Sequence, residues 1–300
     1  MRYRYVTADV FTRDAYGGNP LAVVLDAQGL DGAQMQRIAR EFNYSETSFV
    51  LPPEDVAHTA RVRIFTPDRE VPFAGHPNVG TAVVLAREWQ AAGRPVPETF
   101  VFEEAAGLVR IALRSGEQGV DGARLRAPQP LSRGGTASSA AAARALGLEP
   151  ADIDTSSHLP QVVSVGLAFL VVQLASRDAL RRAAPDVQGY AALLPLDGVK
   201  SIYAYTTDTA AEPQTDLQAR MFTGRMTEDP ATGSATAAVT ALRAALSGGA
   251  LRLRVGQGVD MGRPSLLSAD AEPRPDGVWA GVAGQAVAVM EGTLPTPRPA

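Results

Sequence analysis

One seven-residue pattern occurs twice in the chain, and it limits the possible folds more than any other feature. Residues 76–82 read His-Pro-Asn-Val-Gly-Thr-Ala, and residues 229–235 read Asp-Pro-Ala-Thr-Gly-Ser-Ala. Related strand-like segments precede the two copies, Arg-Ile-Phe-Thr at 63–66 and Arg-Met-Phe-Thr at 220–223. The duplication predicts two similar lobes whose helix starts meet in the cleft between them. Because helix N-termini offer N–H donors and partial positive charge, this cleft is expected to bind an anion.

Composition limits the partners of the chain. The formal net charge of −4 gives no electrostatic footprint for nucleic acid or for an acidic membrane surface. No stretch reaches the ~18 consecutive apolar residues that span a bilayer. The first residues enter an alternating strand pattern without the apolar region of a secretory signal. We therefore expect a cytoplasmic protein that acts on a small molecule, without nucleic acid or membrane partners.

The residue types and motifs that the chain lacks exclude several kinds of catalytic and binding site. The chain has no cysteine, which removes disulfides, thiolate nucleophiles and cysteine-type metal sites. Its one lysine, Lys200, follows no phosphate-binding glycine loop, and no dinucleotide fingerprint follows a strand. The three histidines stand far apart in the sequence. We expect no metal and no cofactor, so carboxylates, histidine, hydroxyls and backbone groups must carry the chemistry.

The distribution of apolar residues predicts an α+β fold. The segments 77–89 and 231–246 read as helices that are apolar nearly all round, which indicates burial on every side. An amphipathic helix is expected at 31–42, and short strands fill most of the remainder. The pattern predicts two pseudo-symmetric lobes, each a barrel-like sheet around one apolar helix. We expect the N-terminal lobe to comprise 1–118 plus 285–300, and the C-terminal lobe 119–284, with a link near 127–140 and separate strands at 277–282 and 285–291.

Three polar residues are candidates for catalysis. Glu46 lies at a helix-to-strand join beside aromatic residues, where partial desolvation would suit a general base, although an exposed strand edge is the simpler interpretation. His76 precedes the helix-starting Pro77 and is a poor N-cap, so it is either functional or a satisfied structural histidine. Asp229 precedes Pro230, and helix capping alone would explain it. Its match to His76 in the repeat favours a shared site.

Small residues follow each of these positions in the repeat. Gly80 and Thr81 in the first copy, and Gly233 and Ser234 in the second, are expected in the first helical turns as donors to a carboxylate. Alternatively, the glycines only let each helix pack closely against a strand. His58 and His158 read as structural or surface residues, and the paired charges Glu103 and Glu104 as a solvated face.

These segments together resemble the PhzF (phenazine biosynthesis-like) family, whose fold is that of diaminopimelate epimerase. The resemblance extends from about residue 9 to 265 and is carried by matching segments at 17–23, 43–47, 63–67, 75–82, 228–235 and 256–265. It implies an active site between two lobes and a cofactor-independent isomerase that acts by proton transfer. Homodimers are usual in this family, so a homodimer is expected.

The resemblance also assigns roles to individual residues. Glu46 resembles the acid/base that removes a proton from carbon and returns it elsewhere, while His76 and Asp229 resemble residues that orient the substrate. Ser45, Gly75, Gly233 and Ser234 resemble substrate-contacting positions. Epimerases on this fold use two opposed thiols, so a chain without cysteine is better suited to a double-bond shift in a small carboxylated substrate. Asn78 stands where the family is expected to have threonine.

Two alternatives remain open at this point. The same fold can support an epimerase or a dehydratase, with Thr81 and Ser234 hydroxyls in place of thiols. A catalytically silent relative that binds a metabolite or a protein is the second alternative, and the presence of Glu46, His76 and Asp229 argues against it.

Overall fold

The computed structural model describes residues 2–117 and 119–297, and the chain forms two compact units. The first unit comprises residues 1–125 and 283–300, and the second comprises 126–282. The boundary expected at residue 118 falls on a residue outside this description. Each unit is described by itself below. No helix among the described residues combines the length and the apolar character needed to cross a membrane.

The strands of the first unit form a closed barrel. Hydrogen bonds join each strand to the next around the ring, and β17 closes it by pairing with both β1 and β8. In order around the barrel these strands are β1 (Arg2–Val10), β2 (Asn19–Val24), β3 (Glu46–Leu51), β4 (Ala60–Phe65), β6 (Thr99–Glu104), β7 (Gly107–Gly116), β8 (Gly119–Arg126) and β17 (Gly277–Pro295). The short β5 (Glu70–Val71) pairs with β4.

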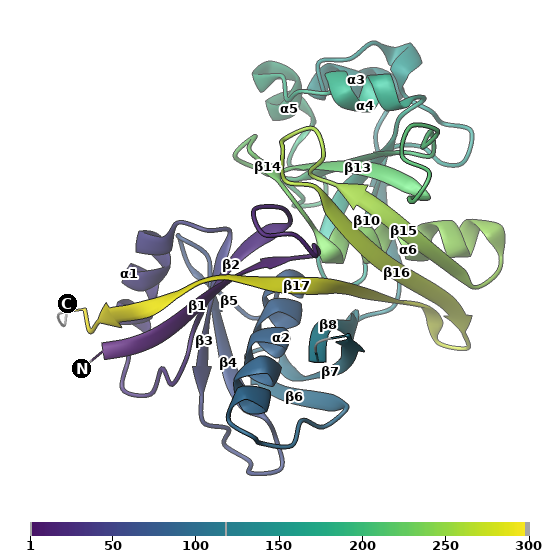
Figure 1. Ribbon diagram of the computed structural model, residues 1–300. Coiled ribbons are helices and arrows are strands. Elements are labelled where there is room, and N and C mark those ends of the chain that lie inside the picture. Colours follow the sequence, from purple (N-terminus) through teal and green to yellow (C-terminus); the bar gives the residue numbers. More distant parts are fainter. Residues whose placement is uncertain (1, 118, 298–300) are drawn as a thin grey trace. The chain divides into compact units, whose positions relative to one another are not determined.

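Helix α2 (Gly75–Ala91) packs against the inner surface of this barrel. Its residues from His76 to Ala86 are all buried, and it contacts β1, β2, β3 and β7 (Figure 1). A helix with apolar side chains on every face gains most from being surrounded on all sides, which the strands of the barrel provide. The prediction of a buried apolar helix in this lobe is confirmed.

Helix α1 (Gly32–Phe42) has the opposite character. Asp31 caps it by accepting a hydrogen bond from the backbone N–H of Gln34, whose side chain accepts from Asp31 N–H in return. Its apolar face, with Met35 and Ile38, packs on Phe49 and Phe65 of the sheet. The amphipathic helix expected at 31–42 is therefore present.

The second unit repeats the same pairing scheme. β10 to β13 pair in sequence, β13 pairs in parallel with β15 as β4 does with β6, and β15 pairs antiparallel with β16. The short β14 pairs with β13 as β5 does with β4. The strands are β9 (Ser132–Thr136), β10 (Gln161–Ser164), β11 (Ala168–Gln173), β12 (Ile202–Thr206), β13 (Leu217–Phe222), β14 (Glu228–Asp229), β15 (Leu251–Gln257) and β16 (Ser265–Arg274).

Helix α6 (Gly233–Ser247) is the counterpart of α2 in the second unit. It is buried along most of its length and contacts β10, β11, β15 and β16. Both units thus consist of a curved sheet around an apolar helix, joined in the same order. The α+β fold predicted from the repeat is confirmed.

Several elements differ from the sequence-based prediction. The segment expected as a link contains β9 and the start of α3 (Ser139–Ala145), and the second unit carries three more short helices: η1 (Pro150–Asp152), α4 (Arg177–Arg182) and α5 (Val187–Leu193). The alanine and leucine side chains of α3 and α4 join a core cluster with β11 and β12. Their burial stabilises helices that are too short to be recognised from periodicity.

The two strands expected at 277–282 and 285–291 are one continuous strand, β17. Gly284 does not break it. A Cβ atom at this position would collide with the ring of Phe11, so the glycine permits close packing rather than a turn.

Candidate active site

The N-terminus of α2 lies within the first unit and carries no side-chain cap. The helix begins at Gly75, and its N-cap Ala74 cannot accept a hydrogen bond through its side chain. No acidic residue stands in the first turn. The N–H groups of Gly75, His76 and Asn78 therefore present positive potential that no acidic residue of the first turn itself neutralises. The prediction that Pro77 is the first helical residue is wrong, because the helix starts two residues earlier and His76 lies inside its first turn.

Glu46 and His76 come together at this helix start. Glu46 is the first residue of β3, and its Oε2 lies 3.5 Å from Nε2 of His76. The His76 side chain is 7% exposed and the Glu46 side chain 20% exposed. Both chemically active atoms are thus largely shielded, although Glu46 retains some access to solvent. The structure brings together two residues that are far apart in the sequence.

His76 is a neutral imidazole at physiological pH. Burial lowers its pKa to about 3, and a hydrogen bond to the Pro20 carbonyl opposes this effect only in part. With Nε2 turned toward Glu46, the ring nitrogen that donates to Pro20 is Nδ1. A neutral ring protonated on Nδ1 has its lone pair on Nε2. His76 therefore offers Glu46 a hydrogen-bond acceptor rather than a positive charge.

Ser45 and Gly75 flank this pair. Ser45 precedes Glu46, and its hydroxyl donates to Oδ1 of Asn19 at 3.4 Å, at the start of β2. Gly75 is the first residue of α2. Both predicted substrate-contacting positions thus lie next to the Glu46–His76 pair along the chain.

Gly80 and Thr81 lie deeper in the helix than expected. They belong to the second turn of α2, so the prediction that they lie in its first turn is wrong. A Cβ on Gly80 would come within 2.6 Å of Leu21 Cδ2 and 2.7 Å of Val10 Cγ2. Thr81 is fully buried. Gly80 therefore lets α2 pack closely against β1 and β2, which was the alternative interpretation of this glycine from the sequence.

Glu104 is a buried carboxyl that the sequence did not indicate. It ends β6, and both of its carboxylate oxygens are shielded from solvent. Burial raises its pKa to about 8, although the Asn78 side-chain amide favours the charged form. The interpretation of Glu103 and Glu104 as a solvated face is wrong for Glu104. Two acidic residues in succession on a strand point to opposite faces, which is the signal that could have revealed it.

Asn78 connects this carboxyl to the helix start. It is fully buried, and its Nδ2 donates to the carbonyl oxygen of the N-cap Ala74 at 3.0 Å. The same side chain favours the charged form of the Glu104 carboxyl and so lowers its pKa, against the effect of burial. Asn78 therefore has a structural function in the first unit, whatever it contributes to substrate choice.

Asp229 lies in the second unit, on a strand rather than on a helix. It belongs to β14 and pairs with Met221, while α6 begins only at Gly233. The interpretation of Asp229 as an N-cap is therefore wrong. Its carboxylate Oδ2 accepts a hydrogen bond from the Thr232 hydroxyl at 2.5 Å. This hydrogen bond orients the Asp229 side chain through Oδ2. The other carboxylate oxygen, Oδ1, takes no part in it.

The side-chain amide of Gln257 fixes the backbone around Asp229. Its Nε2 donates to the Asp229 carbonyl oxygen at 2.8 Å and to Thr232 Oγ1 at 3.0 Å. Its Oε1 accepts from the Thr232 N–H at 3.1 Å. The amide thus uses both ends to hold residues 229–232 in one arrangement.

The start of α6 resembles that of α2. Its N-cap Thr232 makes no side-chain capping bond, and no acidic residue occupies the first turn. Gly233 and Ser234 are the first two residues of the helix, so their predicted placement in the first turn is confirmed. Their N–H groups form a second donor set suited to an anion.

The other two histidines have structural partners. His58 Nδ1 lies 2.8 Å from Glu103 Oε1, and His158 bonds to the Leu159 carbonyl and to the Tyr205 hydroxyl. Among residues 2–117 and 119–297, no three histidine, aspartate or glutamate side chains converge in a way that could hold a metal ion.

The fold and the paired acid/base residues define a class of protein. Two sheets that each surround an apolar helix constitute the diaminopimelate epimerase-like fold, which is shared by a hydroxyproline epimerase from Agrobacterium vitis with a TM-score of 0.60 at 12% identity over 98% of this chain and 91% of that one. The chain belongs to the PhzC-PhzF family of phenazine biosynthesis-like proteins, whose profile matches residues 8–292.

Individual relatives agree with this assignment. An uncharacterized isomerase from Mesorhizobium japonicum is 39% identical, over 97% of this chain and 98% of its own. A trans-2,3-dihydro-3-hydroxyanthranilate isomerase from Pseudomonas aeruginosa is 34% identical, over 97% and 98%. The crystal structure of a PhzF-family protein from Bacillus anthracis superposes with a TM-score of 0.88 at 28% identity, covering 98% of this chain and 99% of that one. The protein is an isomerase of the PhzF family.

Proposed function

We propose that this isomerase shifts a double bond within a small carboxylated substrate by moving one proton with a single base, Glu46. In the reaction, the Glu46 carboxylate takes a proton from carbon, and the electron pair of the broken C–H bond enters the adjacent π system. The Glu46 carboxyl, whose side chain is 20% exposed and can exchange its proton with solvent, then delivers a proton to another carbon. No oxidant, reductant or cofactor is needed to balance this step. The contact that carries the proposal is the one between Glu46 Oε2 and His76 Nε2, 3.5 Å apart.

The protonation state of His76 supports this role for Glu46. A positively charged imidazolium would stabilise the carboxylate and weaken it as a base, whereas the ring is neutral because burial lowers the pKa of His76 to about 3. Once Glu46 has taken a proton, its O–H can donate to the lone pair on Nε2. The acidic proton is then held between two side chains until Glu46 delivers a proton to the second carbon.

The uncapped helix starts supply the binding of the carboxylate. The first turns of α2 and α6 each contain N–H donors and no acidic residue of their own. Such donors favour an anion by hydrogen bonding and by the helix dipole. We propose that Gly75, Gly233 and Ser234 donate to the substrate carboxylate, that Ser45 contacts the substrate beside Glu46, and that Asp229 orients it. A dihydro-hydroxyanthranilate is a reasonable first substrate to test, because relatives at 33–34% identity carry that name.

The buried position of Thr81 weighs against an epimerase or dehydratase that uses hydroxyls. That alternative needs Thr81 beside the substrate, whereas Thr81 is fully buried in the second turn of α2. A single base that removes and returns a proton does not require a second group.

Solvent deuterium incorporation tests the proposal directly. We expect wild-type protein in D2O to place deuterium into a dihydro-hydroxyanthranilate or a related cyclic carboxylate, and Glu46→Gln to lose this activity by ~10²–10⁴-fold. Glu88→Gln, on the outer part of α2, is the matched control and should retain activity. Carboxylate-induced shifts in melting temperature should persist in Glu46→Gln, since the change keeps the shape of the side chain. Near-normal exchange in Glu46→Gln would disprove the assignment of the base, and inversion at a stereocentre would favour the epimerase.

A homodimer in the cytoplasm is also proposed, from the resemblance to the PhzF family. Light scattering across a concentration series tests the assembly, and a monomer at all concentrations would refute it.

A further inference from the structure

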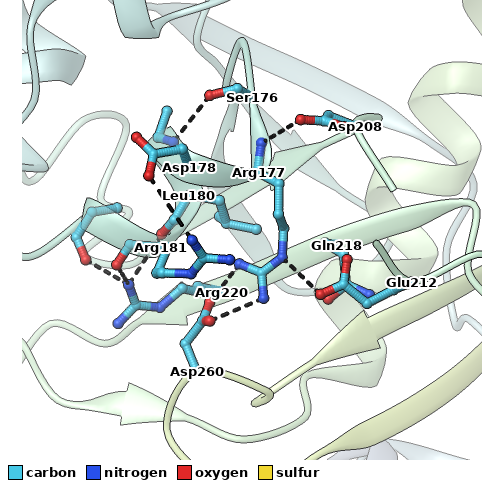
Figure 2. A network of polar contacts seen from close by, with 12 residues as sticks. Ser176, Arg177, Asp178, Leu180, Arg181, Asp208, Glu212, Gln218, Arg220 and Asp260 are labelled. Carbon is cyan, nitrogen blue, oxygen red and sulfur yellow. Dashed lines mark hydrogen bonds and ion pairs between the residues drawn. The ribbon is translucent and has the colours of Figure 1, made fainter. Parts of the chain in front are cut away.

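Arg177, the first residue of α4, forms a buried charged network in the second unit. Its side chain is 8% exposed, and Nη1 and Nη2 donate to Asp260 Oδ2 and Oδ1 at 2.8 and 2.9 Å. Its Nε donates to Glu212 Oε1 at 3.3 Å, and its backbone N–H donates to Asp208 (Figure 2). A two-bond arginine–carboxylate pair specifies geometry strongly, whereas burying such a pair adds little net stability. The network is thus better suited to fixing a position than to stabilising the fold.

The segment that this network fixes is the turn between β15 and β16. Asp260 lies within residues 258–263, which are closed by hydrogen bonds from Gly262 N–H to Val259 O and from Arg263 N–H to Gly258 O. Gly258 has a φ of +73°, and a Cβ there would come within 2.6 Å of the Pro230 carbonyl oxygen. The backbone of the turn therefore lies directly against the residue that follows Asp229.

Residues on both sides of the turn hold the Asp229 segment. Before the turn, Gln257 bonds to the Asp229 carbonyl and to Thr232. After it, the Ser265 hydroxyl donates to the Pro230 carbonyl at 2.9 Å. A continuous series of contacts thus leads from the Arg177 guanidinium through Asp260 to the backbone that carries Asp229.

A second arginine holds the residue before Asp229. Arg220 on β13 donates through Nε and Nη2 to Glu228 at 2.9 and 2.7 Å. Its Nη1 donates to the carbonyl oxygens of Leu180, Arg181 and Ala183, at the end of α4 (Figure 2). Helix α4 is therefore connected at its start to the turn after β15 and at its end to Glu228.

We propose that Arg177 is a positioning residue that acts through Asp260 and the turn at 258–263 to fix the Asp229 carboxylate for the reaction. This inference rests on the proposed participation of Asp229 in catalysis. Arg220 performs the same function for Glu228, and α4 is the rigid element that the two arginines share.

Hydrogen exchange measured by mass spectrometry tests the structural part without any substrate. We expect Arg177→Met to speed exchange about tenfold in peptides covering 226–236 and 256–266, because the turn loses its anchor. Arg182→Met is the matched control, since Arg182 lies on the same helix but pairs with Asp152 and Asp178. Unchanged exchange at 226–236 in Arg177→Met would overturn the proposal, whether or not the protein is an isomerase.

Steady-state kinetics on two backgrounds test the functional part. In otherwise wild-type protein, Arg177→Met should lower kcat on the order of 10²-fold with a smaller change in KM, as expected when a reacting group is displaced. In the Asp229→Asn background the same substitution should change kcat less than about twofold, because the group it positions is already absent. An equal loss on both backgrounds would show that Arg177 acts independently of Asp229 and would overturn the proposal.

A second variant covers the case in which Arg177→Met does not fold. Asp260→Asn removes one charge from the turn and leaves Arg177 paired with Glu212, and it should give the same two effects in weaker form. Failure of the wild type to turn over any carboxylate would refute the proposed function instead, and the exchange experiment would still decide the positioning role.

Discussion

Oε2 of Glu46 and Nε2 of His76 lie 3.5 Å apart, and the imidazole of the pair is uncharged. The two atoms are both acceptors when Glu46 is ionised, so the pair has a place for one additional proton between them. This is the arrangement expected of a group that must take up a proton from a molecule and then deliver a proton back to it.

The neutral state of His76 predicts how stability depends on pH. The His76 pKa is about 3 in the folded protein and 6.5 ordinarily, so between these values only the unfolded chain binds a proton there. Stability should therefore fall as pH drops from about 6.5 toward 3, and His76→Asn should show a weaker fall. Urea titrations at pH 7 and pH 4.5 measure the difference. Ring ¹⁵N NMR at pH 6 should show one protonated nitrogen, and a doubly protonated ring would contradict the assignment.

The buried carboxyl of Glu104 predicts that folding stability changes with pH in the opposite direction. Its pKa is about 8 in the fold against an ordinary 4.5, so the folded state holds a proton that the unfolded state releases. Stability should decrease as pH rises from about 4.5 to about 8, by on the order of 4 kcal/mol at most, since one pKa unit corresponds to ~1.4 kcal/mol. Glu104→Gln should remove most of this decrease in urea titrations at pH 5 and pH 8. Glu103→Gln is the neighbouring control, because the pKa of Glu103 is lowered to about 2, and it should keep the wild-type trend.

A substitution at Gly80 distinguishes a role in helix packing from a role in substrate binding. Gly80→Ala places a methyl group against Leu21 and Val10, and overpacking of this kind costs ~1–3 kcal/mol, partly offset by the ~1 kcal/mol higher helix propensity of alanine. We expect a lower melting temperature with KM unchanged. Gly249→Ala, where a Cβ meets nothing within 4 Å, should be nearly neutral. A rise in KM without loss of stability would instead place Gly80 in contact with substrate.

The hydrogen bond from Thr232 to Asp229 can be removed without altering the charge. Thr232→Val deletes the hydroxyl that donates to Asp229 Oδ2 at 2.5 Å, and hydrogen bonds to charged groups contribute ~1.5–3 kcal/mol. We expect a fall in kcat of ~10–100-fold, smaller than that of Asp229→Asn. Thr232→Ser retains the donor and should recover most of the activity. Equal activity of the valine and serine variants would show that the hydroxyl has no part in the reaction.

The sequence predicted the features that depend on local pattern. The repeat predicted the two similar units. Their central helices were predicted because residues 77–89 and 231–246 have no polar face. The helix starts were predicted less well. The match between His76 and Asp229 suggested equivalent positions, but α2 begins one residue before His76, whereas α6 begins four residues after Asp229. Neither N-cap residue makes a side-chain capping bond, and the N-cap of α2 is an alanine, so the residue types around the two starts do not mark them reliably.

Contacts between distant residues account for what the sequence did not reveal. Strand alternation shows that Glu103 and Glu104 point to opposite faces, but not which face is shielded, because burial depends on α2 and on the strands beside β6. Nothing in the sequence around Arg177 indicates that its side chain is buried, because the residue that neutralises it, Asp260, lies far along the chain. The chain was expected to break near Gly284 because Phe11, the residue that requires the glycine, lies just after β1, at the other end of the sequence.

The long strand β17 has a consequence for synthesis on the ribosome. Residues 283–295 close the first barrel by pairing with β1, in a register that runs from Arg2 opposite Pro295 to Val10 opposite Ala286. At ~5–20 residues per second, translating residues 126–282 takes roughly 8–30 s, during which the nascent first unit has exposed edges on β1 and β8. Exposed strand edges are sites of unwanted pairing. The barrel that is encoded first is therefore completed last, and the nascent chain is most in need of chaperones while its second half is being translated.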